Sequence, residues 1–237
     1  MCSMKKDNVN DRVEEGNAKA NYIAKYVGRR TGVNLVCSTP KEDKQDKIDF
    51  RDPKTNKTFQ VKCRDSGSGF DIIHEHQLFN RETQGVPITK NTKWLVTDGR
   101  DAICKADLFV VKPVKLKKDS KEKIYIVKTK DVNQLCDEAV EEWLKSIGKT
   151  EVDDALLYEL WCNAENTHNK QQDLITAKNG VNVRFKIDEG QNRKNRYAKI
   201  LCFVPPSKVE EHGMFFKKLE LRDGESLYNE STWRNEK

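Results

Sequence analysis

Residues 48–65 read IDFRDPKTNKTFQVKCRD. Two short runs of alternating apolar and polar residues flank a polar stretch that contains Asp52, Pro53 and Asn56. These three residue types favour turns, because they fix or tolerate the backbone angles that a chain reversal needs. The segment therefore predicts a β-hairpin, with KIDFR as its first strand and KTFQVKCR as its second.

Three polar side chains of this hairpin suit the binding of a divalent cation. Asp49 lies in the first strand, and Gln60 and Lys62 share one face of the second, because strand side chains repeat every two residues. A carboxylate and a second oxygen ligand on adjacent strands can hold a hard ion such as Mg²⁺. The lysine can then steady the attacking water in phosphodiester hydrolysis. The alternative is a surface ion pair of about 0.5 kcal/mol.

This arrangement resembles the PD-(D/E)xK nuclease superfamily, which includes restriction endonucleases, archaeal Holliday-junction resolvases and several repair nucleases. Asp49 matches the first acid of the motif, Gln60 the second and Lys62 the lysine. The resemblance covers residues 11–135 and implies an α/β fold with a mixed central β-sheet flanked by helices. Residues 136–237 then form a C-terminal α+β extension. Gln60 departs from the usual acid, so the site carries one negative charge fewer and should bind its metal more weakly.

The resemblance implies a Mg²⁺-dependent endonuclease that hydrolyses DNA, with Mn²⁺ as a substitute, and a type II restriction endonuclease fits the size. The implied metal ligands are Asp49, Gln60, the carbonyl of Val61, and Glu14 and Glu15 of the first helix. The implied substrate is double-stranded DNA, and the implied assembly is a homodimer, because a palindromic site has two-fold symmetry. Two alternatives stay open: a junction-resolvase-like repair or recombination nuclease, and a catalytically inactive nuclease fold that binds DNA.

A second predicted hairpin, over residues 182–206, is basic. Charged residues alternate with apolar ones along its first strand, and further basic residues gather around its turn. Such a ribbon can lie against DNA phosphates or in a major groove, and a solvated hairpin is the equal alternative. Arg64, which follows the candidate lysine closely, is a further phosphate contact. The candidate nucleic-acid contacts are therefore Arg64, Arg184, Lys186, Arg193, Lys194 and Arg196.

The remaining elements follow from hydrophobic periodicity. Helices are predicted over residues 11–29 and 132–148, and a largely helical segment over 153–178. Further strands are predicted at 33–39, 92–99, 106–114 and 121–129. Residues 70–84 fit a strand or a helix equally well.

Composition limits the class of protein. The 237 residues include 44 Lys and Arg against 38 Asp and Glu, a net charge of +6 that fits a polyanionic partner. Seven cysteines stand singly, which argues against a disulfide framework or a zinc ribbon and predicts a reducing, intracellular compartment. We predict no signal peptide and no membrane-spanning segment, because no stretch is long and apolar enough.

The remaining motifs give weaker evidence for a function. His74 and His76 can lie on one strand face as a metal-binding pair, but two ligands without a third favour a structural role. The segment around His168 is only faintly similar to a ββα-metal nuclease, because the preceding histidine pair and cysteine ligands are missing. No glycine-rich phosphate loop and no G-x-S-x-G motif occur.

Overall fold

The computed structural model describes residues 9–63, 72–83, 85–112, 123–189, 196–205, 207–208 and 215–220. Side chains are described for residues 16–63, 72–83, 85–112, 124–188, 197–205 and 207–208. The chain divides into two compact units. Unit 1 takes residues 1–70, 106–127 and 216–237, and unit 2 takes residues 71–105 and 128–215.

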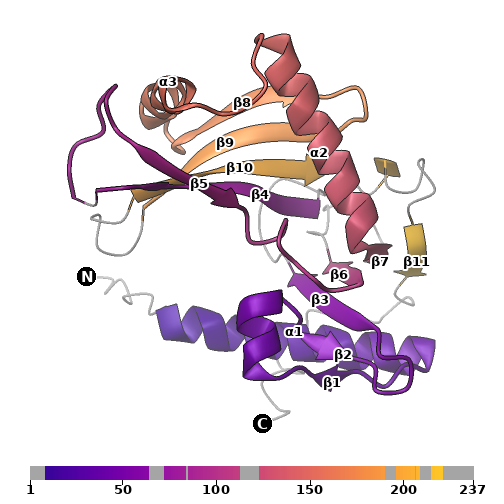
Figure 1. Ribbon diagram of the computed structural model, residues 1–237. Helices are drawn as coiled ribbons and strands as arrows, with labels where there is room; N and C mark the ends of the chain where they lie inside the picture. Colours follow the sequence, from indigo (N-terminus) through magenta and orange to yellow (C-terminus); the bar gives the residue numbers. More distant parts are fainter. Residues whose placement is uncertain are drawn as a thin grey trace, which may run out of the picture. The chain divides into compact units, whose positions relative to one another are not determined.

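Unit 1 combines a helix with a six-stranded sheet (Figure 1). Its elements are α1 (Val9–Thr31), β1 (Val36–Cys37), the π-helix η1 (Glu42–Asp46), β2 (Phe50–Arg51), β3 (Thr58–Cys63), β6 (Leu108–Lys112), β7 (Lys123–Lys128) and β11 (Phe215–Glu220). The strand order is β1-β2-β3-β6-β7-β11. Strand β2 pairs antiparallel with both β1 and β3, whereas β6 pairs parallel with β3, so the sheet is mixed.

The predicted first helix is confirmed as α1. Ile23, Ala24 and Val27 fall on one face at helical spacing and are buried. They pack with alternate residues of the sheet, among them Phe59 and Val61 of β3. This contact fixes which face of β3 the helix covers.

The predicted hairpin is also confirmed, as β2 and β3. Asn56 takes a left-handed backbone conformation, with φ of 58°, and its N–H donates to the Asp52 carbonyl at 2.8 Å. The Asp52 carboxylate accepts hydrogen bonds from the Lys54 N–H and the Thr55 hydroxyl. Local turn chemistry therefore closes the hairpin without help from distant residues.

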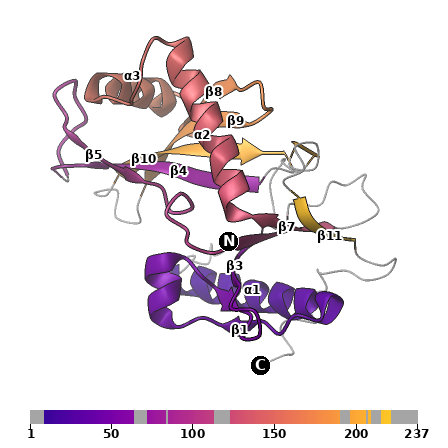
Figure 2. The same ribbon diagram turned by 45° about the vertical axis from the view of Figure 1, so that its right-hand side comes forward.

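Unit 2 is a five-stranded antiparallel sheet with two helices (Figure 2). Its elements are β4 (Ile72–Arg81), β5 (Trp94–Asp98), α2 (Thr129–Ser146), α3 (Asp154–Glu165), β8 (Gln171–Thr176), β9 (Asn182–Glu189) and β10 (Arg196–Val204). The strand order is β5-β4-β10-β9-β8. Both helices lie over the same face of this sheet, where Val183, Phe185 and Ile187 of β9 are buried.

Several predicted elements agree with unit 2 and one differs. The helix predicted over 132–148 is α2, the basic hairpin is β9 and β10, and residues 70–84, left open, contain strand β4. The helix predicted over 153–178 was wrong in its second half. Helix α3 ends at Glu165, Lys170 reverses the chain with φ of 50°, and β8 then pairs with β9. Tertiary pairing overrides a weak local preference there.

The predicted strand at 33–39 is reduced to two residues, whereas the strands expected near 92–99, 106–114 and 121–129 are present as β5, β6 and β7. The α/β class is confirmed at the level of mixed helices and sheets. The expected boundary after residue 135 does not coincide with the two units, because β4 and β5 join β10 in a second sheet instead of extending the first. No described helix is long and apolar enough to cross a membrane.

Candidate active site

Asp49 is fixed between η1 and β2. Its N–H donates to the Phe59 carbonyl at 2.9 Å, and its carbonyl accepts from the Ser38 N–H at 2.9 Å. Its carboxylate Oδ2 accepts the Val61 N–H at 2.7 Å. Pairing of β2 with β3 ends at Phe50 and Phe59, so this carboxylate takes the place that a strand carbonyl would otherwise occupy. The acid is therefore held at the end of the hairpin ladder.

The carbonyl of Val61 points toward the same side as its N–H, because both groups of a strand residue face one neighbour. Its N–H faces Asp49, so the carbonyl faces the Asp49 side of β3 and not β6. A carboxylate and a backbone carbonyl thus border one place at the edge where β2 ends.

Gln60 and Lys62 alternate onto the face of β3 that α1 does not cover. Both side chains are half-buried. Their neighbours in the parallel ladder, Phe109 and Val111, are 2% and 3% exposed, so the surroundings are apolar. The Gln60 Oε1 atom is buried and has no hydrogen-bond partner. A buried oxygen without a partner lowers the stability of the fold by about 1–3 kcal/mol. A bound ligand at this oxygen would offset that loss.

These oxygens fit a hard divalent cation, which takes carboxylate, amide and backbone carbonyl ligands. Asp49, Gln60 and the Val61 carbonyl would hold it, and the unpartnered Gln60 oxygen is the observation that favours this fit. Among the described residues, no three His, Cys, Asp or Glu side chains gather closely enough to bind a metal. The proposed ligand set differs from such a cluster, because only one of its ligands, Asp49, is a carboxylate.

Glu14 and Glu15 lie on α1, but their side chains are outside the described residues. The buried part of α1 packs on the face of β3 opposite Gln60 and Lys62. The packing of α1 therefore gives these two glutamates no additional support as ligands.

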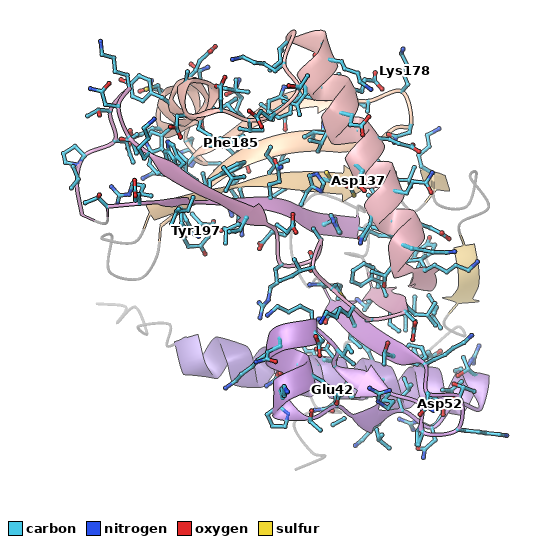
Figure 3. The ribbon with its side chains drawn as sticks, viewed as in Figure 1. Glu42, Asp52, Asp137, Lys178, Phe185 and Tyr197 are labelled. Carbon is cyan, nitrogen blue, oxygen red and sulfur yellow. The ribbon has the colours of Figure 1, made fainter. Side chains whose placement is uncertain are left out.

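The segment before Asp49 is itself anchored through Glu42, which is labelled in Figure 3. Glu42 of η1 accepts hydrogen bonds from the Thr39 N–H and hydroxyl, and it pairs with Arg51 of β2. The Thr39 N–H, followed by Arg51, lowers the pKa of Glu42 to about 2. The loop that carries Asp49 is thus tied at both ends, to Thr39 before it and to β2 after it.

A second anchor was missed by the sequence analysis. The Thr58 N–H and hydroxyl both donate to Asp107 Oδ2 at 2.9 Å, and the Asp107 N–H donates back to the Thr58 hydroxyl at 3.0 Å. These bonds join the beginnings of β3 and β6 and set their parallel register. The only signal in the sequence is an acid directly before an apolar strand, which is too common to single out.

The predicted nucleic-acid contacts divide into two groups. Arg64, Arg193 and Lys194 lie outside the described residues, as does the side chain of Arg196 at the start of β10. The other two are paired with acids. Arg184 Nε lies 2.5 Å from Asp173 Oδ1, and Lys186 Nζ lies 3.2 Å from Asp188 Oδ1.

His74 and His76 lie on β4 of unit 2, whereas Asp49, Gln60 and Lys62 belong to unit 1. His76 Nδ1 lies 3.6 Å from Asp137 Oδ1 of α2. Burial lowers the pKa of His76, against the opposing influence of Asp137 and Asp98. His168 is exposed in the turn between α3 and β8. The two β4 histidines therefore belong to a different sheet from the strands of the candidate site.

Comparison with models of known protein families, with curated proteins and with solved structures found no match.

Proposed function

We propose that unit 1 is a metal-dependent nuclease site that hydrolyses DNA phosphodiester bonds, in a restriction-endonuclease-like sheet. The observation that carries this proposal is the grouping at the end of the β2–β3 hairpin. Asp49 is held against Val61, and the unpartnered oxygen of Gln60 shares a strand face with Lys62. The chain order supports it, because one helix precedes three antiparallel strands and a parallel neighbour.

Each residue has a distinct role in this proposal. Asp49, Gln60 and the Val61 carbonyl would hold Mg²⁺ or Mn²⁺, which would supply a water of lowered pKa and offset phosphate charge. Lys62 donates hydrogen bonds to the attacking water or to a phosphate oxygen. Phe109 and Val111 provide an apolar floor that strengthens these electrostatic interactions.

The proposed substrate is double-stranded DNA, and a type II restriction endonuclease is the specific class that we favour. Sequence-specific cutting and branch-specific cutting differ in substrate, so a junction-resolvase-like nuclease is separated by the choice of DNA. One observation favours a second function, a DNA-binding module without catalysis. Gln60 is neutral, and the one carboxylate already accepts the Val61 N–H, so metal affinity is reduced.

The test is cleavage of supercoiled plasmid, genomic DNA and four-way junctions with Mg²⁺, Mn²⁺ or chelator. We expect discrete fragments that require metal and are lost in Lys62→Ala. Lys54→Ala is the matched control, because Lys54 lies exposed in the turn of the same hairpin. Cutting of junctions alone would indicate a resolvase.

A second readout does not depend on turnover. Calorimetric titration of the intact protein with Mn²⁺ should show binding that is lost in Asp49→Asn and strengthened in Gln60→Glu. Uncut DNA in all conditions together with no metal binding would contradict the proposal and favour the binding module. Cleavage that persists in Lys62→Ala would show that the site lies elsewhere.

A further inference from the structure

Strand β5 is an edge of the unit 2 sheet (Figure 1). It pairs with β4 on one side, and no described strand pairs with it on the other. Leu95 and Val96 are 54% and 47% exposed, although they lie on opposite faces of the strand. Edge strands are usually protected by charge, proline or bulges, because their free backbone groups invite pairing with another chain. Between Trp94 and Thr97 the strand's own residues include none of these, although Asp154 of α3 covers the Trp94 N–H.

The hydrogen bonds show which backbone groups of β5 face outward. The Lys93 carbonyl accepts from the Glu82 N–H at 3.1 Å, and the Gly99 N–H donates to the His76 carbonyl at 2.7 Å. Both bonds fit the β4–β5 register, in which odd-numbered residues of β5 bond to β4. The N–H and C=O groups of Val96 therefore point away from the sheet.

An independent contact confirms this assignment. Trp94 is also even-numbered, and its N–H donates to Asp154 Oδ1 of α3 at 3.2 Å instead of to β4. The same alternation turns both backbone groups of Asp98 outward. Outward-facing groups are thus the N–H and C=O of Val96 and of Asp98, together with the Trp94 carbonyl.

We propose that β5 pairs with β5 of a second copy of this chain, antiparallel about a two-fold axis at Val96. The Val96 N–H of each copy donates to the Val96 carbonyl of the other. The Asp98 N–H of each copy donates to the Trp94 carbonyl of the other. The two five-stranded sheets then form one continuous sheet. This proposal does not rest on the nuclease activity proposed above.

A second copy is the occupant because the strand is complementary to itself. The antiparallel register places Leu95 opposite the other copy's Thr97, with the two Leu95 side chains diagonal to each other. The centre carries no charge, so nothing repels there. The Lys93 end of each strand lies against the Asp98 end of the other, where Lys93 Nζ also lies 2.8 Å from Asp154 Oδ2 of its own chain. Such a short interface predicts a dimer in the micromolar range.

The test is sedimentation equilibrium of the full chain from low to high micromolar concentration. Val96→Pro removes the outward donor without a loss to the β4 ladder, since proline is tolerated where an edge N–H faces away. Val96→Lys adds a charge at the two-fold axis. Val86→Lys is the matched control, because Val86 is 50% exposed in the loop before β5.

We expect a wild-type dimer that weakens at least tenfold in Val96→Pro and Val96→Lys and is unchanged in Val86→Lys. Hydrogen exchange of the wild type should slow at the Val96 and Asp98 amides as concentration rises. If Val96→Pro misfolds by circular dichroism, Val96→Lys and the exchange data decide alone. A wild-type monomer at all concentrations would overturn the proposal, and so would a dimer that Val96→Lys leaves intact.

Discussion

Two half-buried polar side chains, Lys199 in unit 2 and Gln60 in unit 1, differ in how their polar atoms are satisfied. In unit 2, Lys199 Nζ lies 2.9 Å from Glu75 and 2.5 Å from Asp188, so a cation with little exposure has two acids as partners. In unit 1, the buried Gln60 Oε1 has no hydrogen-bond partner. A buried charge that is paired with opposite charges needs no functional role to account for its presence. An unpartnered buried oxygen costs stability, and unit 2 has some as well, among them Gln77 Oε1 and Asn182 Oδ1. What distinguishes Gln60 is that it shares a strand face with Lys62 beside the carboxylate of Asp49.

The pKa shifts in unit 2 support this distinction. Burial tends to raise the pKa of Asp188, but hydrogen bonds and charge from Lys199 and Lys186 bring it below its ordinary value. Burial tends to lower the pKa of Lys199, and its two acidic partners raise it instead. Both groups are therefore charged in the folded state because they stabilise each other.

The largest expected effect is on catalysis. Asp49→Asn should reduce metal-dependent DNA cleavage at least ~100-fold, because a charged metal ligand is lost. Its stability should change little, since the amide oxygen can still accept the Val61 N–H. Rates from a plasmid assay and unfolding curves in urea check both parts. Asp188→Asn is the matched change in unit 2, and it should leave cleavage intact. Equal loss of activity in both variants would contradict the comparison.

The next effect is on stability. Lys199→Met should lower the free energy of unfolding by about 3 kcal/mol, because Glu75 and Asp188 remain with little exposure and no cation between them. Urea denaturation measures this change. Lys178→Met, at an exposed lysine of the same unit, should lie within about 0.5 kcal/mol of wild type. Similar losses in the two variants would show that the Lys199 pairs contribute nothing specific.

A smaller effect of opposite sign is expected at Gln60. Gln60→Leu should leave stability unchanged or raise it by about 1 kcal/mol, because a buried oxygen without a partner is removed. DNA cleavage should fall in the same variant. A clear loss of stability would show that the Gln60 amide is part of the fold's own hydrogen bonding.

The smallest effect depends on pH. The folded pKa of Glu42 is about 2, below the ordinary 4.5, so its stabilising contribution is present above pH 4.5. That contribution is lost as the pH falls through 2. Glu42→Gln should therefore melt slightly below wild type at pH 6, and the difference should shrink as the pH approaches 2. Calorimetric melting curves over this range test it, and a constant difference would count against the assigned cause.

Local chemistry made the hairpin predictable. Asp52 and Asn56 form a turn through contacts within five residues, and the strand alternation puts Gln60 and Lys62 on one face. The contact between Asp49 and Val61 was not predictable, because it depends on where β2 stops pairing. Sequence alternation alone does not set that point.

The second sheet was hidden for a different reason. Strand β4 pairs with β10, with Ile72 opposite Val204, and no local pattern specifies a partner so far along the chain. Strand β8 has only six residues, and its alternation is too short to separate it from a continuing helix. The prediction of a largely helical segment over 153–178 was therefore wrong at β8.

The interleaving of the two units has a consequence for how the chain folds during synthesis. Strands β3 and β6 pair in parallel across an intervening segment that carries β4 and β5, and those two strands complete their own sheet only when β10 has emerged from the ribosome. Neither sheet can be finished in the order of translation. Many contacts of both sheets close long loops, which slows folding and leaves the β4 edge that later pairs with β10 exposed in nascent chains. A chain released after residue 135 would lack β8, β9 and β10, and β4 would keep β5 as its one sheet partner.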